Sequence, residues 1–416
     1  MPRELMFEVI TADQASEKIL SHWQLPARLE RVGLRDTWNR ILSEDVVAPE
    51  DVPGFSRSTM DGYAVNAEDT FGASESLPAY LTLRGEVPMG VKPEQVIDMD
   101  ETMAVATGSM LPQGANAVVM IERTAKIDDR TIAVFRPVAP GENILEKGED
   151  VGANQVVLRR GTLVRGQEMG VLASLGITEV EVFCLPNVGI ISTGNELVEP
   201  EKTPSPGQIR DSNSYTLYGA VKDAGGQPHL YRLVPDQEEE FRATILKAVE
   251  ENQVVLVSGG SSVGTRDLTL KILNQLGELL FHGIAVKPGK PTLATVVKDS
   301  SGTNTLVIGL PGHPVSAFIT FRRLVEPLLK GHLRELLPPA CVYGRLTKNI
   351  PSQAGREEHV RVRLISQGEQ VLVEPVFGKS GMLTSLTAAH GVVTVSLEAQ
   401  GLAAGSEVAV KLFKEL

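Results

Sequence analysis

Hydrophobic and polar positions along the chain change their spacing several times, and each change predicts a different kind of element. Near the amino terminus, Thr11 and Gln14 form a capping-box pattern, and an apolar stripe of helical spacing follows them. Between residues 48 and 140, short β-rich runs such as AYLTLRGEV and AVVMIER are separated by proline and glycine turns. A helical stretch at 166–176 then ends on a glycine. The β-rich stretch is therefore predicted to be an insertion within a small α+β domain.

Strand and helix patterns alternate from residue 184 to residue 331. NVGIIS, QVVLVSGG and TLVIGL are apolar strand patterns, and each leads through a turn toward a helical pattern. This alternation is typical of a mostly parallel sheet that helices cover on both faces. One of these helices is predicted to turn four apolar side chains inward, namely Phe241, Ile245, Leu246 and Val249.

Short alternating strands such as HVRVRLIS and VVTVSL replace the helices beyond residue 332 and predict a small β-barrel. The fold class is therefore multidomain α/β plus β. Its four predicted domains are a discontinuous α+β domain (1–47 and 141–183), an inserted β-rich domain (48–140), an α/β domain (184–331) and a C-terminal β-barrel domain (332–416).

Composition and charge narrow the possible partners. The chain has 416 residues, a formal net charge of -12 and no long basic run, which argues against nucleic acid as a partner. No apolar run approaches the roughly 20 residues needed to span a bilayer, so we expect no membrane partner. The two cysteines have no metal-ligand spacing, and the amino terminus lacks the pattern of a signal peptide. We therefore expect a cytoplasmic protein, and one that binds anions through local glycine turns and cations.

Three glycine turns follow predicted strands of the α/β domain: IISTGNEL (190–197), VSGGSSVGTRD (257–267) and GLPGHPVSA (309–317). A strand that ends in Gly-Gly lets backbone N–H groups face a ligand, and the next helix adds its positive end. One such turn is weak evidence because loops of this kind often contain glycine. Three turns in one sheet favour a site for phosphate or another small oxyanion.

Cations and carboxylates near these turns have both structural and functional interpretations. Lys287 and Lys290 lie on a short, stiff KPGKP loop, where they are either ligands of an anion or solvated lysines. Asp267 follows the SGG turn and is either the N-cap of the next helix or a ligand of Mg²⁺. Asp236 and Glu239 already account for each other as a helix start. Glu196 could bind a heterocycle edge or cap a turn.

Two more aspartates lie outside the α/β domain. Asp61 and Gly62, in STMDGYAV, have the pattern of a β-hairpin turn as well as that of a site carboxylate. Asp150, in GEDVG, has the same ambiguity.

Taken together in their order along the chain, these segments resemble a known family. DVPGFSRSTMDGYAV, ATGSMLPQGANAVV, GEDVG, ISTGNEL, VSGGSSVGTRD, KPGKP and GLPGHPVSA are similar to the signature segments of the molybdopterin molybdenumtransferase (MoeA) family, which includes the gephyrin E domain. The resemblance runs from about residue 7 to the carboxyl terminus. The segment 186–331 alone is less specific, because an adenylyltransferase family of the same pathway shares that domain.

The resemblance implies a homodimer of four-domain subunits with its active site between subunits. It implies an enzyme of molybdenum cofactor biosynthesis that inserts molybdate into the dithiolene of adenylylated molybdopterin. Mg²⁺ is the implied cofactor, AMP is released, and a molybdopterin adenylyltransferase is a candidate partner.

Site residues are carried over by position. Asp61, Asp150, Asp267 and Lys287 match residues needed for catalysis, with Asp267 as the metal ligand. The substrate-binding positions that the resemblance and the turns suggest are Thr107, Gly108, Glu196, Asp236, Ser258, Gly259, Gly260, Lys290, Pro311, Pro314, Arg356 and Ser380.

Two positions depart from the family pattern. Gly283 stands where many members have a cation, so either Lys290 or Arg266 would supply that charge or the anion is held differently. His313 stands where many have Asn, and its simpler interpretation is a turn residue that hydrogen-bonds locally. The sharper alternative is a change in preference between molybdate and tungstate.

Two other functions compete with the insertase. An adenylyltransferase would need only the α/β domain, and a scaffold for protein partners could dispense with Asp61, Asp150 and Asp267, which are all present.

Overall fold

Contacts divide the computed structural model into two compact units. The first unit contains Met1–Glu30 with Phe183–Leu416, and the second contains Arg31–Val182. The structure describes residues 9–259, 263–331 and 341–413. At residues 263–267 and 331 it describes the backbone alone. Within these stretches no helix is long and apolar enough to cross a membrane.

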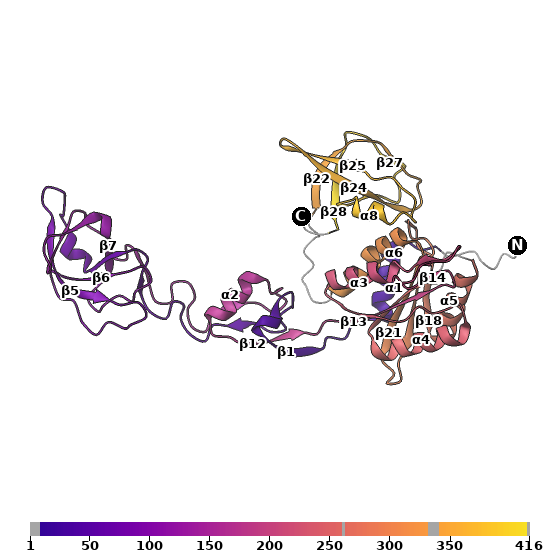
Figure 1. Ribbon diagram of the computed structural model, residues 1–416, viewed down its shortest axis with the longest axis horizontal. Helices are drawn as coiled ribbons and strands as arrows, with labels where there is room; N and C mark the ends of the chain where they lie inside the picture. The colour runs from indigo at the N-terminus through magenta and orange to yellow at the C-terminus, as the bar shows by residue number, and fades with distance from the viewer. Residues whose placement is uncertain (1–8, 260–262, 332–340, 414–416) are drawn as a thin grey trace. The chain divides into compact units, whose positions relative to one another are not determined.

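A six-stranded sheet forms the centre of the first unit (Figure 1). Its strand order is β16-β13-β17-β21-β20-β18, in which the first four strands are parallel and the last two are antiparallel to their neighbours. The strands are β16 (Gln227–Leu230), β13 (Asn187–Thr193), β17 (Val254–Gly259), β21 (Asn304–Leu310), β20 (Leu293–Lys298) and β18 (Glu278–His282). The predicted mostly parallel sheet is confirmed.

Helices cover both faces of this sheet because its strands are apolar on both sides. Val254 and Leu256 of β17 face one core, and Val255 and Val257 face the other. The first core contains residues of α1 (Ala12–His22), α3 (Asn213–Asp223), α6 (Pro314–Thr320) and the π-helical η5 (Phe321–Val325), which leads into α7 (Glu326–Gly331). The second core contains residues of α4 (Glu238–Glu251) and α5 (Val263–Leu276).

Helix α1 packs on the α/β core. The capping box at Thr11 and Gln14 is present as predicted, and Ile19 is fully buried. The buried stripe of α1 belongs to the same cluster as strands of the large sheet, and Ile10 forms a β-bridge with Ile284. Residues 9–30 therefore group with the α/β domain, not with residues 141–183, because the apolar face of α1 is buried there.

The last part of the first unit is a closed β-barrel of five strands, as predicted. The strands pair in the order β24-β25-β22-β28-β26, and β26 returns to β24. They are β22 (Cys341–Leu346), β24 (Glu357–Gln367), β25 (Gln370–Pro375), β26 (Gly391–Val395) and β28 (Glu407–Leu412); β23 (Ile350–Pro351), β27 (Gly401–Leu402) and α8 (Thr384–Thr387) lie between them in sequence. The two-residue strand β19 (Val286–Lys287) of the α/β domain pairs with β24 and so joins the domain to the barrel.

The second unit is mostly β-structure. Its largest sheet has the order β7-β4-β6-β5-β9-β8, formed by β4 (Gly62–Val65), β5 (Ala79–Val87), β6 (Glu101–Val105), β7 (Ala117–Met120), β8 (Thr124–Lys126) and β9 (Thr131–Val134). A smaller part surrounds α2 (Gly166–Ser174), where Leu42, Val164 and Leu172 form a separate core. Short strands form three two-stranded ladders in this unit and at its ends in sequence. They are β2 (Val46–Val47) with β11 (Val156–Leu158), β1 (Leu29–Gly33) with β12 (Glu179–Phe183), and β3 (Arg57–Ser58) with β10 (Ile144–Leu145).

Candidate active site

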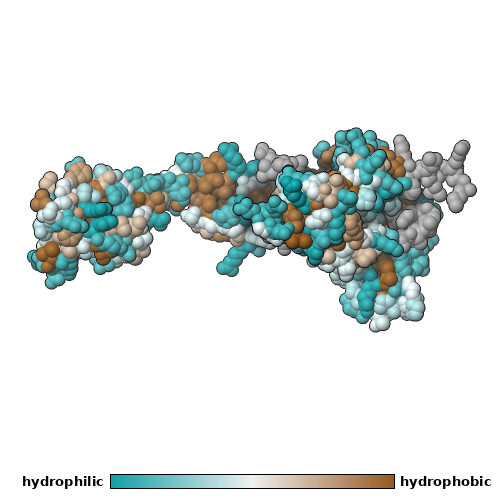
Figure 2. Space-filling view, turned by 90° about the horizontal axis from the view of Figure 1, so that it is seen from above, coloured by the Kyte–Doolittle hydropathy of each residue, from teal (hydrophilic) through white to brown (hydrophobic). Residues whose placement is uncertain are grey.

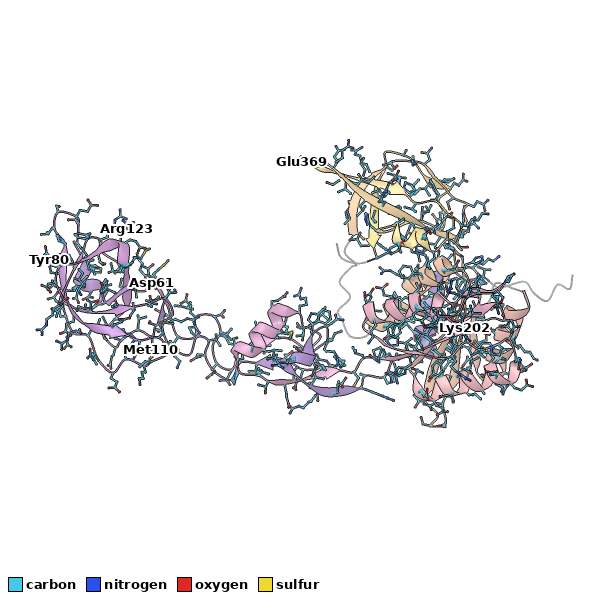
Figure 3. All side chains as sticks on the ribbon, viewed as in Figure 1. Asp61, Tyr80, Met110, Arg123, Lys202 and Glu369 are labelled. Atoms are coloured by element: carbon cyan, nitrogen blue, oxygen red, sulfur yellow. The ribbon has the colours of Figure 1, made fainter. Side chains whose placement is uncertain are left out.

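Asp61 lies at a bend before β4, with Thr107 beside it (Figure 3 labels Asp61). Asp61 Oδ1 accepts hydrogen bonds from the backbone N–H of Thr107 at 2.7 Å and from its hydroxyl at 3.0 Å. These two bonds, the backbone bond foremost, hold the pKa of Asp61 below its usual value. Gly108 donates its N–H to Ser58 O at 2.8 Å and has a φ of +92°. Asp61 is therefore a carboxylate at neutral pH, suited to orient water rather than to act as an acid.

The hairpin interpretation of Asp61 and Gly62 is wrong. Strand β4 pairs with β6 and β7, so no two-residue turn joins it to a preceding partner strand. Glycine is needed at position 62 for another reason, since a Cβ there would lie 1.9 Å from the carbonyl oxygen of Val119. The close approach of β7 fixes the backbone that presents Asp61.

Asp150 is exposed, and its backbone N–H donates to Val52 O at 3.1 Å. Sequence reasoning missed a charged pair in the same segment. Lys147 Nζ lies 3.3 Å from Asp51 Oδ2, and Asp51 Oδ1 accepts from the N–H of Ala153 at 2.8 Å. The Ala153 bond, followed by Lys147, lowers the pKa of Asp51. Lys147 directly precedes GEDVG in the sequence, and this cation was the signal that could have indicated the pair.

In the first unit, Asp236 is held at the end of β13. Thr193 Oγ1 donates to Asp236 Oδ1 at 2.9 Å, and the N–H of Asp236 donates to Asn195 Oδ1 at 3.1 Å. The capping interpretation of Asp236 is wrong, because α4 begins at Glu238 after the N-cap Gln237. Asp236 therefore lies at the carboxyl edge of the sheet, where ligands of parallel sheets bind.

Glu196 lies over the same turn. A Cβ at Gly194, which has a φ of +154°, would lie 2.7 Å from Glu196 Oε2. Only glycine fits there without moving that carboxylate. The structure thus places Glu196 and Asp236 on the loops that follow β13 and β16.

The SGG turn and the proline turn are joined by Asn213, a residue that sequence reasoning missed. Asn213 Nδ2 donates to Ser258 Oγ at 2.7 Å and to Gly312 O at 2.8 Å, and Asn213 is only 9% exposed. The available signal was the polar RDSN segment that opens helix α3. Gly259 ends β17, while Gly260 lies outside the described residues.

The N-cap interpretation of Asp267 is wrong, because α5 begins at Val263 and Asp267 is already inside the helix. Its side chain, like that of Arg266, lies outside the described residues. Pro311 is buried at the end of β21, and Pro314 is at the first turn of α6.

Lys287 forms an ion pair with the barrel. Its Nζ lies 2.7 Å from Glu358 Oε1, and Ser352 Oγ donates to Glu358 Oε2 at 2.7 Å. Lys287 is half-exposed, so it differs from the simple solvated lysine of the alternative interpretation. Lys290 is exposed, and its carbonyl accepts from the N–H of Ile284. Gly283 has a φ of +106°, which explains why glycine occupies the place of the expected cation.

The two barrel residues of the predicted site have different surroundings. Arg356 Nη2 donates to Gln353 Oε1 at 3.0 Å. Ser380 lies against the proline turn, where its Oγ is 2.8 Å from His313 Nδ1 and its carbonyl accepts from the N–H of Val315 at 3.1 Å.

Arg361 is a second residue that sequence reasoning missed. It is 7% exposed and donates to Gly378 O at 2.7 Å, two residues from Ser380, and to Ser385 Oγ. Among the described residues, no carboxylate forms an ion pair with it. Burial lowers its pKa. The available signal was an arginine between the apolar residues of HVRVRL.

Comparison with known proteins covers nearly the whole chain. Residues 10–176 match the MoeA N-terminal region (domain I and II), 189–331 match a probable molybdopterin binding domain, and 343–413 match the MoeA C-terminal region (domain IV). A curated molybdopterin molybdenumtransferase of Haemophilus influenzae is 34% identical over 98% of this chain and 100% of its own. A putative molybdopterin biosynthesis protein of Methanocaldococcus jannaschii is 35% identical over 96% of both chains. The crystal structure of a molybdopterin biosynthesis MoeA protein from Pyrococcus horikoshii has a TM-score of 0.84 at 35% identity, covering 98% of this chain and 100% of that one.

The architecture is thus an α/β domain of the molybdopterin-binding type between two regions that are characteristic of MoeA proteins. An adenylyltransferase built on the α/β domain alone would leave both of those regions unexplained. The chain belongs to the MoeA family of molybdopterin molybdenumtransferases, enzymes of molybdenum cofactor biosynthesis.

Proposed function

We propose that this enzyme inserts molybdate into the dithiolene of adenylylated molybdopterin in the cytoplasm, with Mg²⁺-dependent hydrolysis of the phosphoanhydride and release of AMP. The observation that carries the proposal is the carboxyl edge of the large sheet. There Asn213 joins the SGG and proline turns, and Glu196 and Asp236 lie on the loops beside them. Such an edge offers N–H groups to phosphates and carboxylates to a cation.

The donor set of this edge fits Mg²⁺. Mg²⁺ usually takes one or two protein carboxylates and completes its shell with phosphates and water. Asp236 and Glu196 would supply these carboxylates together with Asp267, whose side chain lies outside the described residues. Among the described residues, no group of three or more His, Cys, Asp or Glu side chains is placed to hold a metal ion. When bound, Mg²⁺ would neutralise negative charge on the phosphates. Amides of the SGG turn and the ammonium of Lys287 would stabilise the charge that grows during phosphoanhydride cleavage.

Molybdate would bind at the loop that carries Ser380. A hydroxyl and a buried cation suit an oxyanion, and Arg361 lies under this loop through its bond to Gly378. We therefore assign the cationic role to Arg361 in place of Arg356, whose described partner is Gln353. Asp61 would stay ionised because its pKa is lowered, and as a carboxylate it would orient water, with Asp150 acting beside it.

The second unit supports the proposed homodimer. Figure 2 shows apolar side chains gathered on one face of the part that carries α2. That part has exposed apolar residues, among them Trp38, Val47 and Val156. An exposed apolar surface of this kind favours contact with another protein, and we propose a second copy of the chain, with the active site between subunits. An adenylyltransferase partner stays a prediction.

The decisive experiment measures AMP release from adenylylated molybdopterin with Mg²⁺, titrating molybdate and tungstate separately. We expect release that depends on one oxyanion, together with metal in the pterin product. Asp61→Asn should lower the rate at least a hundredfold, a magnitude of about 3 kcal/mol in the barrier. Asp129→Asn, which changes an exposed carboxylate of the same unit, is the matched control and should leave the rate unchanged. Tight substrate binding without release under either oxyanion would refute the proposal in favour of a scaffold.

A further inference from the structure

His313 reaches out of the proline turn to the barrel. Its Nδ1 lies 2.8 Å from the hydroxyl oxygen of Ser380, a residue 67 positions away in sequence. Although His313 is at the N-cap position of α6, its side chain makes no capping hydrogen bond to that helix. The interpretation of His313 as a locally bonded turn residue is therefore wrong, and the ring has one described partner, the Ser380 hydroxyl.

The backbone around Ser380 is held by contacts that do not involve this ring. The N–H of Val315 donates to Ser380 O at 3.1 Å, and Arg361 donates to Gly378 O at 2.7 Å. Val315 and Ile319 of α6 also pack against Val392 of the barrel. We therefore expect the loop to keep its position when the imidazole is removed. The hydrogen bond between His313 and Ser380 then affects only the direction in which the Ser380 hydroxyl points.

A serine hydroxyl has one proton to donate and two lone pairs that accept. If Nδ1 accepts that proton, Ser380 turns only lone pairs toward a ligand, and these repel an oxyanion. If Nδ1 carries a hydrogen, it donates to Ser380 Oγ, and the O–H is free to donate to an oxyanion. The second arrangement is the one that matches an anion-binding loop next to a buried arginine.

We propose that His313 is a positioning residue, whose Nδ1–H donates to Ser380 and directs the serine proton toward the oxyanion substrate. This inference rests on the proposed function, in which Ser380 binds molybdate. His313 acts through Ser380, so removing its ring should matter only while the serine hydroxyl is present.

Substitution of His313 by Asn or Asp tests whether position 313 must donate or accept a hydrogen bond, because the two side chains have nearly the same shape. In both residues the terminal polar atom that replaces Nδ1 is the same number of bonds from Cβ. His313→Asn supplies an N–H donor there, and half-saturation by molybdate should stay within about twofold of the parent enzyme. His313→Ala lacks the donor and should raise the half-saturating molybdate concentration about fivefold, as for one lost hydrogen bond. His313→Asp accepts the serine proton and adds a negative charge, so the concentration should rise further than with alanine.

The test is a double-mutant cycle on His313→Ala, Ser380→Ala and the double variant. It measures molybdate-dependent AMP release by the full-length enzyme, and molybdate binding alone by calorimetry. We expect the double variant to equal Ser380→Ala within about twofold, because the histidine has no route to the oxyanion except the serine. The midpoint of urea unfolding should be the same for all four proteins.

The outcomes separate this inference from the function on which it rests. If Ser380→Ala leaves molybdate half-saturation unchanged, the molybdate site proposed above is wrong. If Ser380→Ala weakens molybdate but His313→Ala does not, or if the two effects multiply, the positioning role is overturned and the site stands. A His313→Asn variant as weak as His313→Ala would also overturn it.

Discussion

Replacing Arg361 with methionine should cost the enzyme oxyanion binding but little folding free energy. Arg361 is a buried guanidinium whose described acceptors, Gly378 O and Ser385 Oγ, are both neutral. A buried cation without a carboxylate is costly to desolvate, and burial accordingly lowers its pKa. Such a residue is explained if it binds a charge that the enzyme meets only in its substrate.

The expected change in the free energy of unfolding follows from the hydrogen bonds that Arg361 and its two acceptors lose. Two hydrogen bonds from a charged donor contribute about 3–6 kcal/mol together, and the desolvation of the ion opposes them by several kcal/mol. Gly378 is exposed, so its carbonyl can bind water in the variant. Ser385 still donates its hydroxyl to Met382 O and keeps a partner. Methionine fills most of the arginine stem, and the net change in the free energy of unfolding should lie within about 2 kcal/mol of zero.

Urea unfolding of the full chain measures the folding change, and AMP release at increasing molybdate measures the functional one. We expect the half-saturating molybdate concentration to rise at least tenfold, which corresponds to about 1.4 kcal/mol. Arg363→Met on the same strand is the matched control, because Arg363 is exposed and paired with Glu374. A loss of more than about 4 kcal/mol in unfolding free energy, with normal molybdate dependence, would show that Arg361 is a structural residue.

Two further predictions concern stability. Gly62→Ala would place Cβ 1.9 Å from a backbone carbonyl of the neighbouring strand, so the free energy of unfolding should fall by more than about 3 kcal/mol. Gly170→Ala in helix α2, where a Cβ meets open space, should raise it by about 0.5–1 kcal/mol, and equal effects in urea unfolding would contradict the reasoning. Glu357 has its pKa lowered to about 2, because hydrogen bonds from His359 and Arg323 outweigh burial. Its stabilisation should be complete above about pH 4.5 and lost as the pH falls toward about 2, and Glu357→Gln should flatten that part of the stability curve.

Sequence patterns predicted the layers of the α/β domain well because both faces of its strands are apolar. They were less accurate for neighbouring residues at the border between the buried and the exposed face of a helix. Phe241, Ile245 and Val249 are buried as predicted, but Leu246 is 40% exposed. One residue further along a helix turns the side chain by about 100°, which takes Leu246 off the stripe that Ile245 defines.

The site could be predicted as far as its turns but not as far as its contacts. Capping patterns assigned Asp236 to a helix start, yet its carboxylate is held by Thr193 from a different strand. Asn213 and Arg361 were missed for the same reason, since their partners are 45 and 17 or more positions away in sequence. Periodicity reports which face a residue occupies, and it carries no information about which distant loop meets that residue.

Strand β24 connects the barrel to the candidate site in the α/β domain. Its residue Glu357 pairs with Arg323 of η5, and the next residue, Glu358, pairs with Lys287 of the KPGKP loop. Three positions further on, Arg361 lies under the loop that brings Ser380 to the proline turn. Because backbone pairing with β19 fixes the register of β24, a shift of the strand by one residue would turn all these side chains to the opposite face. The joint placement of Glu358 and Arg361 on one strand supports the proposal that the barrel positions both the Lys287 ammonium and the loop proposed to bind the oxyanion.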